Sequence, residues 1–192
     1  MTFRFPHDVP GWLTEEEGQF LYKLADEGGN ILEIGAYCGR STICMAQNEE
    51  YCETVYTIDT FDGRATPTPG STYLPFLTNL AHYGVLGSVV PYVGLASRIV
   101  PILHTSLRFN LVFVDAAHDY LSVMKDAELA WSVLNKTGRI AFHDYESPQD
   151  PEVTQAINYL ISVNEWTLVD KVGTVAVLKP PYYNGKIEEE KA

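Results

Sequence analysis

Short runs of β-branched and aromatic residues alternate along the chain with segments whose hydrophobic residues recur every three or four positions. The runs are typical of buried strands, and the recurring positions are typical of amphipathic helices. The expected strands cover 31–34, 55–59, 89–93, 111–115 and 139–144, followed by a closing pair at 166–169 and 174–178. The expected helices begin at Thr14 and then cover 41–47, 74–83, 96–103, 120–134 and 153–161. This alternation predicts an α/β domain with a mostly parallel sheet and helices on both faces.

Local signals refine the ends of several elements. Thr14, with Glu17 three residues later, has the spacing of a capping box at a helix start. Gly138 stands where a C-cap glycine would end the helix at 120–134. The two closing strands are joined through Gly173, so we expect them to form an antiparallel pair at the edge of the sheet.

The length of 192 residues allows a sizeable core and is most simply explained by one domain, 1–192. Within it, residues 1–30 would form an N-terminal arm and the first helix. The segment 62–79 is rich in Gly, Pro and Thr and would be a lid or a substrate-recognition insertion. The charged run 185–192 is expected to be a frayed tail.

Charge and cysteine content narrow the classes of partner. The formal net charge of −12 argues against nucleic acid, because phosphate binding needs basic patches. No stretch approaches the roughly 18 apolar residues of a membrane span, and the N-terminus lacks the pattern of a signal peptide. Cys38, Cys44 and Cys52 lack the spacing of a zinc site or a disulfide framework, so we expect buried free thiols. These features predict a cytoplasmic protein.

The segment 31–42 joins a short strand to a helix through a turn that contains Gly35 and Gly39. In an open α/β sheet, ligands bind where such a strand ends and its helix begins. The spacing differs from the G-x-G-x-x-G of dinucleotide sites, which counts against a nicotinamide dehydrogenase. Glu33 would repel phosphate but could accept hydrogen bonds from an ammonium group. Taken alone, the pattern fits a ligand-binding turn and a plain strand–turn–helix unit with structural glycines about equally well.

Polar residues stand at the C-terminal ends of four expected strands and in the turns that follow. Parallel strands bring these ends to one edge of the sheet, where polar groups are costly unless they bind something. The residues are Glu33, Asp59, Asp115, His118, His143 and Asp144. Their number predicts a functional site at this edge. His118 could instead cap the helix that starts near Asp119.

Three groups of motifs carry a resemblance to a known family. The E-x-G-x-x-x-G-x-S/T pattern, with Asp59 ending the next strand, resembles the S-adenosylmethionine (SAM) site of class I methyltransferases. The runs 115–120 (DAAHDY) and 140–145 (IAFHDY), with 11–14 (GWLT) ahead of the first helix, look like the sugar and small-molecule O-methyltransferases of methyltransferase family 24. The match extends from about 11 to 178. It implies a Rossmann-like, open and twisted sheet.

The resemblance implies where the methyl donor would lie. The methionine part of SAM would contact the glycine turn, which Glu33 would support. Asp59 would accept hydrogen bonds from the ribose hydroxyls, and the adenine would lie beside 95–97. The implied cofactor-binding residues are Glu33, Gly35, Ala36, Tyr37, Gly39, Ser41, Thr42, Asp59, Thr60, Phe61, Leu95, Ala96, Ser97 and Asp115.

The resemblance also implies a catalytic centre. In metal-dependent relatives, an acid at Asp115 and a pair at His143 and Asp144 hold a magnesium ion, and the histidine at His118 is the general base. The implied catalytic residues are thus Asp115, His118 and Asp144, and the implied metal ligands are Asp115, His143 and Asp144. Relatives commonly have an acid in place of His143, and imidazole is a poor ligand for a hard ion. A softer ion such as Mn²⁺ in place of Mg²⁺, an acid/base role of His143, and a metal-free site therefore all stay open.

The function that follows is transfer of a methyl group from SAM to a hydroxyl of a small molecule, such as a sugar or a diol-like acceptor. The alternatives are a metal-independent N- or C-methyltransferase and a SAM-binding module without turnover. The insertion 62–79 and the N-terminal arm would recognise the acceptor. Trp12 would either cover the SAM site or anchor the arm, and the apolar arm could also pack against a second copy in a homo-oligomer.

Overall fold

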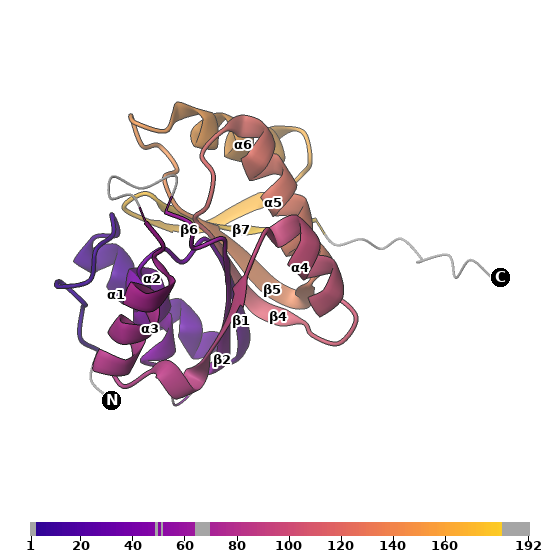
Figure 1. Cartoon of the computed structure of the whole chain (residues 1–192). Coiled ribbons are helices and arrows are strands. Elements are labelled where there is room, and N and C mark those ends of the chain that lie inside the picture. Colours follow the sequence, from indigo (N-terminus) through magenta and orange to yellow (C-terminus); the bar gives the residue numbers. More distant parts are fainter. Residues whose placement is uncertain (1–2, 49, 51, 64–69, 182–192) are drawn as a thin grey trace.

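The computed structural model describes residues 3–48, 50, 52–63 and 70–181 (Figure 1). The predicted tail 185–192 and residues 64–69 of the predicted insertion lie outside the described residues. The described chain forms one sheet with helices on both of its faces.

Seven strands of the described chain form the sheet, in the order β3-β2-β1-β4-β5-β7-β6. The strands from β3 to β5 are parallel, and β7 is antiparallel to both β5 and β6. This arrangement confirms the predicted mostly parallel sheet with an antiparallel edge. The bounds are β1 Gly29–Ile34, β2 Cys52–Asp59, β3 Val89–Val93, β4 Phe109–Val114, β5 Leu134–Phe142, β6 Thr167–Val172 and β7 Val175–Lys179.

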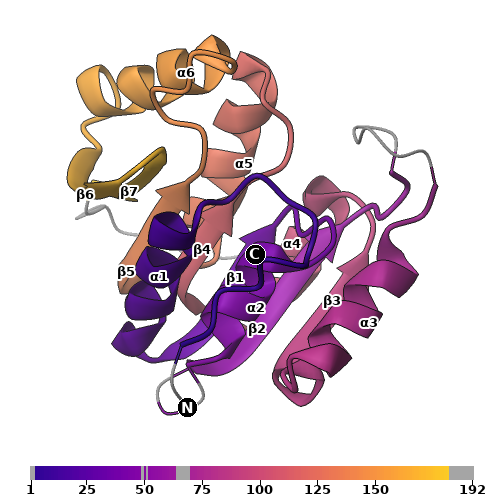
Figure 2. The same ribbon diagram turned by 90° about the vertical axis from the view of Figure 1, so that its left-hand side faces the viewer.

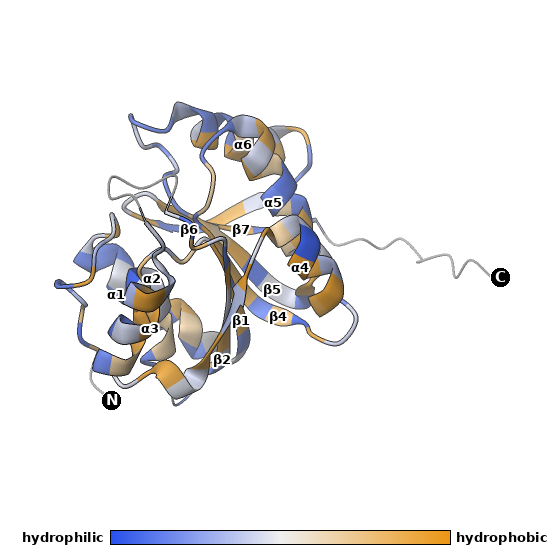
Figure 3. Ribbon diagram, in the orientation of Figure 1, coloured by the Kyte–Doolittle hydropathy of each residue, from blue (hydrophilic) through white to orange (hydrophobic). Residues whose placement is uncertain are grey.

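Six α-helices of the described chain cover the sheet. Buried side chains of α1, α2 and α3 pack in one core cluster, and those of α4, α5 and α6 pack in a second cluster on the opposite face. Figure 2 looks onto the face that carries α1, α2 and α3. In Figure 3, hydrophobic residues gather on the strands and on the helix sides that face them, as burial of apolar surface requires. The bounds are α1 Glu15–Leu24, α2 Arg40–Ala46, α3 Tyr73–His82, α4 Ala96–Leu103, α5 Tyr120–Ser132 and α6 Pro151–Ser162.

The start of α1 confirms the capping box. The Thr14 side chain accepts a hydrogen bond from the backbone N–H of Glu17, and the Glu17 carboxylate accepts one from the backbone N–H of Thr14. Two helix-terminal donors are satisfied in this way. In the described part of the chain, no helix has the length and apolar character that crossing a membrane requires. Cys38, Cys44 and Cys52 are buried and free, as predicted.

The region between α5 and β5 corrects the sequence prediction. The helix ends at Ser132, so Leu134 begins β5, and Gly138 lies inside that strand rather than at a helix C-cap. The register between β4 and β5 is irregular here. Leu134 pairs with Phe109, but the next pair is Arg139 with Leu111, so β5 starts before Gly138 and carries extra residues relative to β4. A Cβ atom at Gly138 would lie 2.9 Å from the carbonyl oxygen of Asn110, so the glycine permits close strand packing rather than ending a helix.

Candidate active site

A cavity of about 1200 Å³ opens at the C-terminal edge of the parallel strands. The chain order reverses there, since β2 and β3 extend the sheet on one side of β1 and β4 lies on the other. One end, which we call the glycine-loop end, is formed by 35–37, 59–60 and 94–97. The other, the histidine end, is formed by Glu17, Asp115, His118, His143, Asp144, 147–150 and Thr174. Single-ligand pockets usually measure about 300–1000 Å³, so this cavity has room for two small molecules side by side.

Gly35 fixes the turn after β1. Its φ is +93°, and a Cβ atom there would lie 2.0 Å from the backbone oxygen of Asp115. Only glycine therefore allows the loop after β1 to approach the end of β4 this closely. Gly39 also has a positive φ, of +90°, and a Cβ atom there would lie 3.0 Å from the Phe76 ring. The two glycines of the motif thus serve close packing as well as turn geometry.

The Asp59 carboxylate organises the glycine-loop end. Its Oδ2 accepts hydrogen bonds from the backbone N–H groups of Ala36 and Tyr37, both at 2.8 Å, and its Oδ1 accepts one from Phe61 at 2.6 Å. Tyr37 and Phe61 have φ values of 48° and 51°. Non-glycine residues in this left-handed region store strain that typically gathers at functional sites. Asp59 therefore holds two strained loops together at the edge of the cavity.

Glu33 is buried behind the glycine turn. Its two oxygens accept hydrogen bonds from the hydroxyls of Ser41 and Thr42, each at 2.5 Å. Burial opposes ionisation and raises the pKa of Glu33 to about 8. The carboxyl group braces the start of α2, and its hydrogen-bonding positions face these hydroxyls rather than the cavity.

The cavity gathers most of the residues predicted to bind the cofactor. Four of the predicted residues, Glu33, Gly39, Thr42 and Phe61, do not line it. The residues that line it are Gly35, Ala36, Tyr37, Ser41, Asp59, Thr60, Leu95, Ala96, Ser97 and Asp115.

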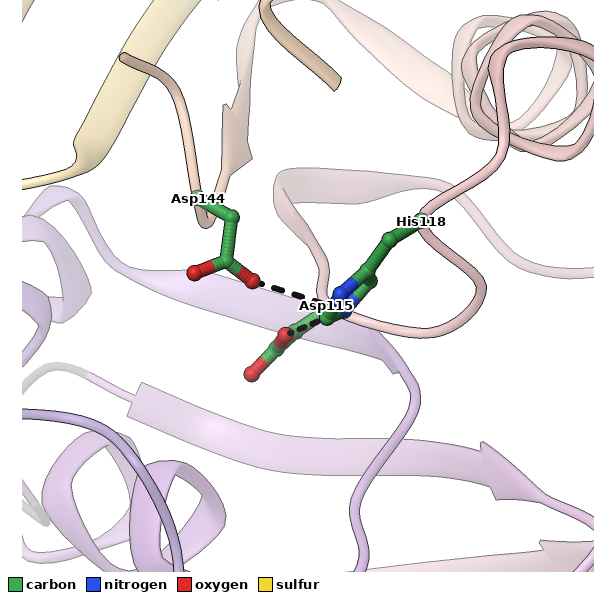
Figure 4. A group of neighbouring side chains, drawn as sticks. All are labelled: Asp115, His118 and Asp144. Carbon is green, nitrogen blue, oxygen red and sulfur yellow. Dashed lines mark ion pairs between the residues drawn. The ribbon is translucent and has the colours of Figure 1, made fainter. Parts of the chain in front are cut away.

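The imidazole of His118 lies close to three carboxylates at the histidine end. Its Nε2 lies 3.4 Å from Asp144 Oδ2 and 3.8 Å from Asp115 Oδ1 (Figure 4), and its Nδ1 lies 2.8 Å from Asp150 Oδ1. The nearby carboxylate of Asp115, together with those of Asp150 and Asp144, raises the pKa of His118 to about 9, although partial burial acts in the opposite direction. Asp144 adopts a positive φ of 61°. One ligand atom each from Asp115, His118 and Asp144 lie within 4.8 Å of one another, close enough to share a metal ion.

His143 lies deeper in the same cluster and is 5% exposed. Its Nδ1 is 3.4 Å from Asp115 Oδ1 and 3.3 Å from Asp144 Oδ2, while its Nε2 points to Glu17 Oε2 at 3.7 Å. Burial opposes the charged imidazolium, but the surrounding carboxylates outweigh it and raise the pKa of His143 to about 12. In the described structure, the ring that the resemblance implied as a metal ligand is thus buried among carboxylates that favour its protonated form.

Glu17 is a site residue that the sequence prediction treated only as part of a helix cap. Its carboxylate is buried, accepts hydrogen bonds from the backbone and hydroxyl groups of both Thr14 and Thr174, and faces His143. These hydrogen bonds and His143 hold the pKa of Glu17 well below its usual range, although burial acts in the opposite direction. Because Thr174 is 157 residues away, no local pattern could reveal this contact.

The N-terminal arm borders the cavity through Trp12. The guanidinium of Arg40 donates hydrogen bonds to the backbone carbonyls of Val9, Gly11 and Leu13 and so clamps the arm. The indole of Trp12 packs on Tyr37 with ring centroids 5.4 Å apart, and the residue is 64% exposed. Trp12 therefore offers an aromatic surface at the cavity rather than a buried anchor.

The fold resembles several solved methyltransferase structures. A putative O-methyltransferase from Klebsiella pneumoniae superposes with a TM-score of 0.70 at 21% identity, covering 91% of this chain and 84% of that one. An O-methyltransferase from Bacillus cereus in complex with SAH (S-adenosylhomocysteine) gives 0.68 at 19% identity, with coverages of 90% and 85%. The O-methyltransferase TomG from Streptomyces achromogenes, in complex with SAM, gives 0.67 at 22%, with coverages of 87% and 80%.

Sequence comparison points the same way. Uncharacterized protein R132 of Acanthamoeba polyphaga mimivirus is 32% identical in an alignment of 136 residues, with 68% of this chain covered. The aligned region spans 58% of the length of that relative. A family model described as a methyltransferase domain matches residues 32–145, more than half of the chain. The match begins within β1, ends just after β5 and includes both the glycine turn and the histidine cluster, so the chain belongs to this methyltransferase family.

Proposed function

We propose that the protein transfers the methyl group of SAM to a hydroxyl group of a small molecule. The observation that carries the proposal is the placement of His118. Asp150 holds its Nδ1, and its Nε2 faces Asp144 and Asp115 in a cavity that also contains the glycine turn. Neighbours of the same fold are described as O-methyltransferases, one in complex with SAH and one with SAM.

The glycine-loop end is the proposed site of SAM. The methionine part would lie against 35–37 and Ser41, and the adenine would lie beside 95–97. Asp59 would accept hydrogen bonds from the ribose hydroxyls. The two oxygens of its carboxylate offer about four acceptor positions, and the backbone N–H groups bound to it do not fill all of them. Glu33 would act indirectly, by holding Ser41 and Thr42.

The histidine end is the proposed site of the acceptor and of the chemistry. The acceptor oxygen attacks the methyl carbon, the bond between that carbon and sulfur breaks, and its electron pair stays on sulfur to give SAH. The hydroxyl proton passes to Nε2 of His118, which must reach the neutral form first. Asp150 fixes the ring through Nδ1, so that Nε2 is the nitrogen presented to the acceptor.

The cluster also suits a divalent cation. Asp115 and Asp144 supply oxygen ligands, which suit hard divalent ions such as Mg²⁺ and Mn²⁺. Such an ion would lower the pKa of an acceptor hydroxyl. Nε2 of His118 cannot both ligate an ion and accept the proton, so a metal-assisted site would bind the ion through the two carboxylates and leave the imidazole as the base.

The proposal is tested by calorimetric titration with SAM, SAH and NAD, each with and without Mn²⁺, followed by measurement of SAH release from a panel of hydroxylated acceptors. We expect binding of SAM and SAH, none of NAD, and turnover that His118→Gln abolishes without loss of SAM binding. SAM binding with no turnover on any acceptor would favour the binding module. Turnover that survives exhaustive chelation would remove the metal from the proposal and keep the methyl transfer.

A further inference from the structure

The histidine end of the cavity is walled by carboxylates from four separate segments. Glu17 comes from α1, Asp115 from the end of β4, Asp144 from the loop after β5, and Asp150 from the turn before α6. Each of them contacts an imidazole, of His118 or of His143. These four carboxylates therefore surround the place where the proposed acceptor must lie.

The net charge of this end is negative in every protonation state of the two histidines. Four carboxylates face at most two imidazolium ions, which leaves at least two negative charges uncompensated. A divalent cation on Asp115 and Asp144, with His118 as a neutral base, would still leave a net charge of about −1 even if His143 were protonated. The formal charge of −12 on the whole chain adds a field of the same sign.

The permanent cations that line the described part of the cavity do not offset this charge. They are Arg40 and Lys125. The Arg40 guanidinium is committed to backbone carbonyls of the N-terminal arm. Lys125 lies on α5 beside Asp126, which lowers its net effect. A phosphate or carboxylate on the acceptor would therefore meet carboxylates without a matching guanidinium or ammonium partner.

Trp12 gives a second, independent reason to expect a positively charged group in the cavity. Its indole lines the cavity, and more than half of the residue is exposed. An exposed aromatic face attracts cations through its quadrupole. Together, the aromatic face and the carboxylates form a surface suited to a positively charged group.

We infer that the acceptor is a hydroxylated molecule that is uncharged or carries an amino group, and that molecules bearing phosphate or carboxylate groups are poor acceptors. This inference rests on the proposed function and narrows its substrate class. Nucleotide-linked sugars and acyl-CoA thioesters fall on the disfavoured side.

Two sets of acceptors, each with a cationic, a neutral and an anionic member, test the inference. One is 3,4-dihydroxyphenylethylamine, the corresponding ethanol and the corresponding acetate; the other is glucosamine, glucose and glucuronate. SAH release is measured as kcat/KM at saturating SAM, for the full chain with and without Mn²⁺. We expect the amine to exceed the carboxylate by at least tenfold in whichever set is methylated. The gap should shrink between about 0.1 M and about 1 M salt, where the Debye length falls from about 10 Å to about 3 Å.

A pair of variants distinguishes the effect of the carboxylates at the histidine end on acceptor preference from the effect of the overall charge of the protein. Asp150→Asn removes one carboxylate of the histidine end, and we expect the ratio of amine to carboxylate turnover to fall severalfold, whatever happens to each rate. Asp170→Asn removes the same charge from the exposed strand β6 and should leave the ratio unchanged.

Each outcome decides a different question. Equal or greater turnover of the carboxylates would overturn the inference and leave the proposed methyl transfer intact. Equal effects of Asp150→Asn and Asp170→Asn would show that the overall charge sets the preference and would overturn the assignment to this end of the cavity. No SAH from any of the six acceptors, with SAM binding measured separately, would count against the proposed function itself and withdraw the inference with it.

Discussion

Glu33→Gln provides a direct test of how the glycine turn is held. The wild-type carboxyl group is fully buried and has a pKa of about 8, against about 4.5 in an ordinary setting. Because the pKa in the fold lies above the unfolded value, the side chain stays protonated in the fold while the unfolded chain ionises. The resulting cost to stability is absent in acid, grows as the pH rises above about 4.5, and levels off above about 8.

The size of this cost follows from the pKa difference. At pH 7 the unfolded side chain is about 2.5 pH units above its own pKa, and each unit is worth about 1.4 kcal/mol, so protonation in the fold costs about 3 kcal/mol. Glutamine has the same shape as a protonated glutamate and can pair with both the Ser41 and the Thr42 hydroxyl. The substitution removes the titration while it keeps the contacts.

The measurement is urea unfolding of both proteins at pH 5, 6, 7, 8 and 9. The difference in unfolding free energy, variant minus wild type, should increase by about 1.4 kcal/mol per pH unit from about pH 5 to about pH 8 and then level off. Glu128→Gln, at an exposed position of α5, is the matched control for loss of one carboxylate. A difference that stays constant over this range would refute the reasoning, because it would mean that Glu33 ionises in the fold as readily as in the unfolded chain.

Four further substitutions, one of them a control, test other parts of the protein. Gly35→Ala should destabilise the fold by more than about 3 kcal/mol, because its Cβ would meet the Asp115 backbone. Gly84→Ala, at a position with a positive φ but open space around it, should cost only about 1–2 kcal/mol in the same urea unfolding assay. Glu17→Gln should cost about 3 kcal/mol and shift the imidazole NMR signals of His143, whereas unchanged signals would contradict the contact. Asp150→Asn should lower kcat at least tenfold with the KM for SAM unchanged; a change confined to that KM would remove Asp150 from the chemistry.

The elements of the fold were predictable because their causes are local. Hydrophobic periodicity, the Thr14 capping box and the position of Gly173 between the closing strands depend on neighbouring residues, and the structure confirms each of them. The prediction at Gly138 was wrong because a glycine after a helix also suits a strand that must pass close to its neighbour. That choice depends on Asn110 in the adjacent strand, which no local window contains.

The candidate site was predictable only in part, for the same reason. Ends of parallel strands converge whatever their sequence, so Asp115, His118 and Asp144 could be grouped from topology. The partner of His118 on its other side, Asp150, is 32 residues away in a loop, and the partner of His143 is Glu17 in the first helix. Such pairings depend on how separate layers dock, so they become visible only in the assembled fold.

The bond between Glu17 and Thr174 has a consequence for biosynthesis. As the chain leaves the ribosome, α1 can form early and its capping box satisfies Oε2 of Glu17, but Oε1 gains its partner Thr174 only when the turn between β6 and β7 emerges. Loop closure over such a separation is slow relative to local structure. A nascent chain that lacks this turn would have most of its sheet but an incomplete wall at the histidine end, so the proposed catalytic site would be completed only after β6 and this turn have been synthesised.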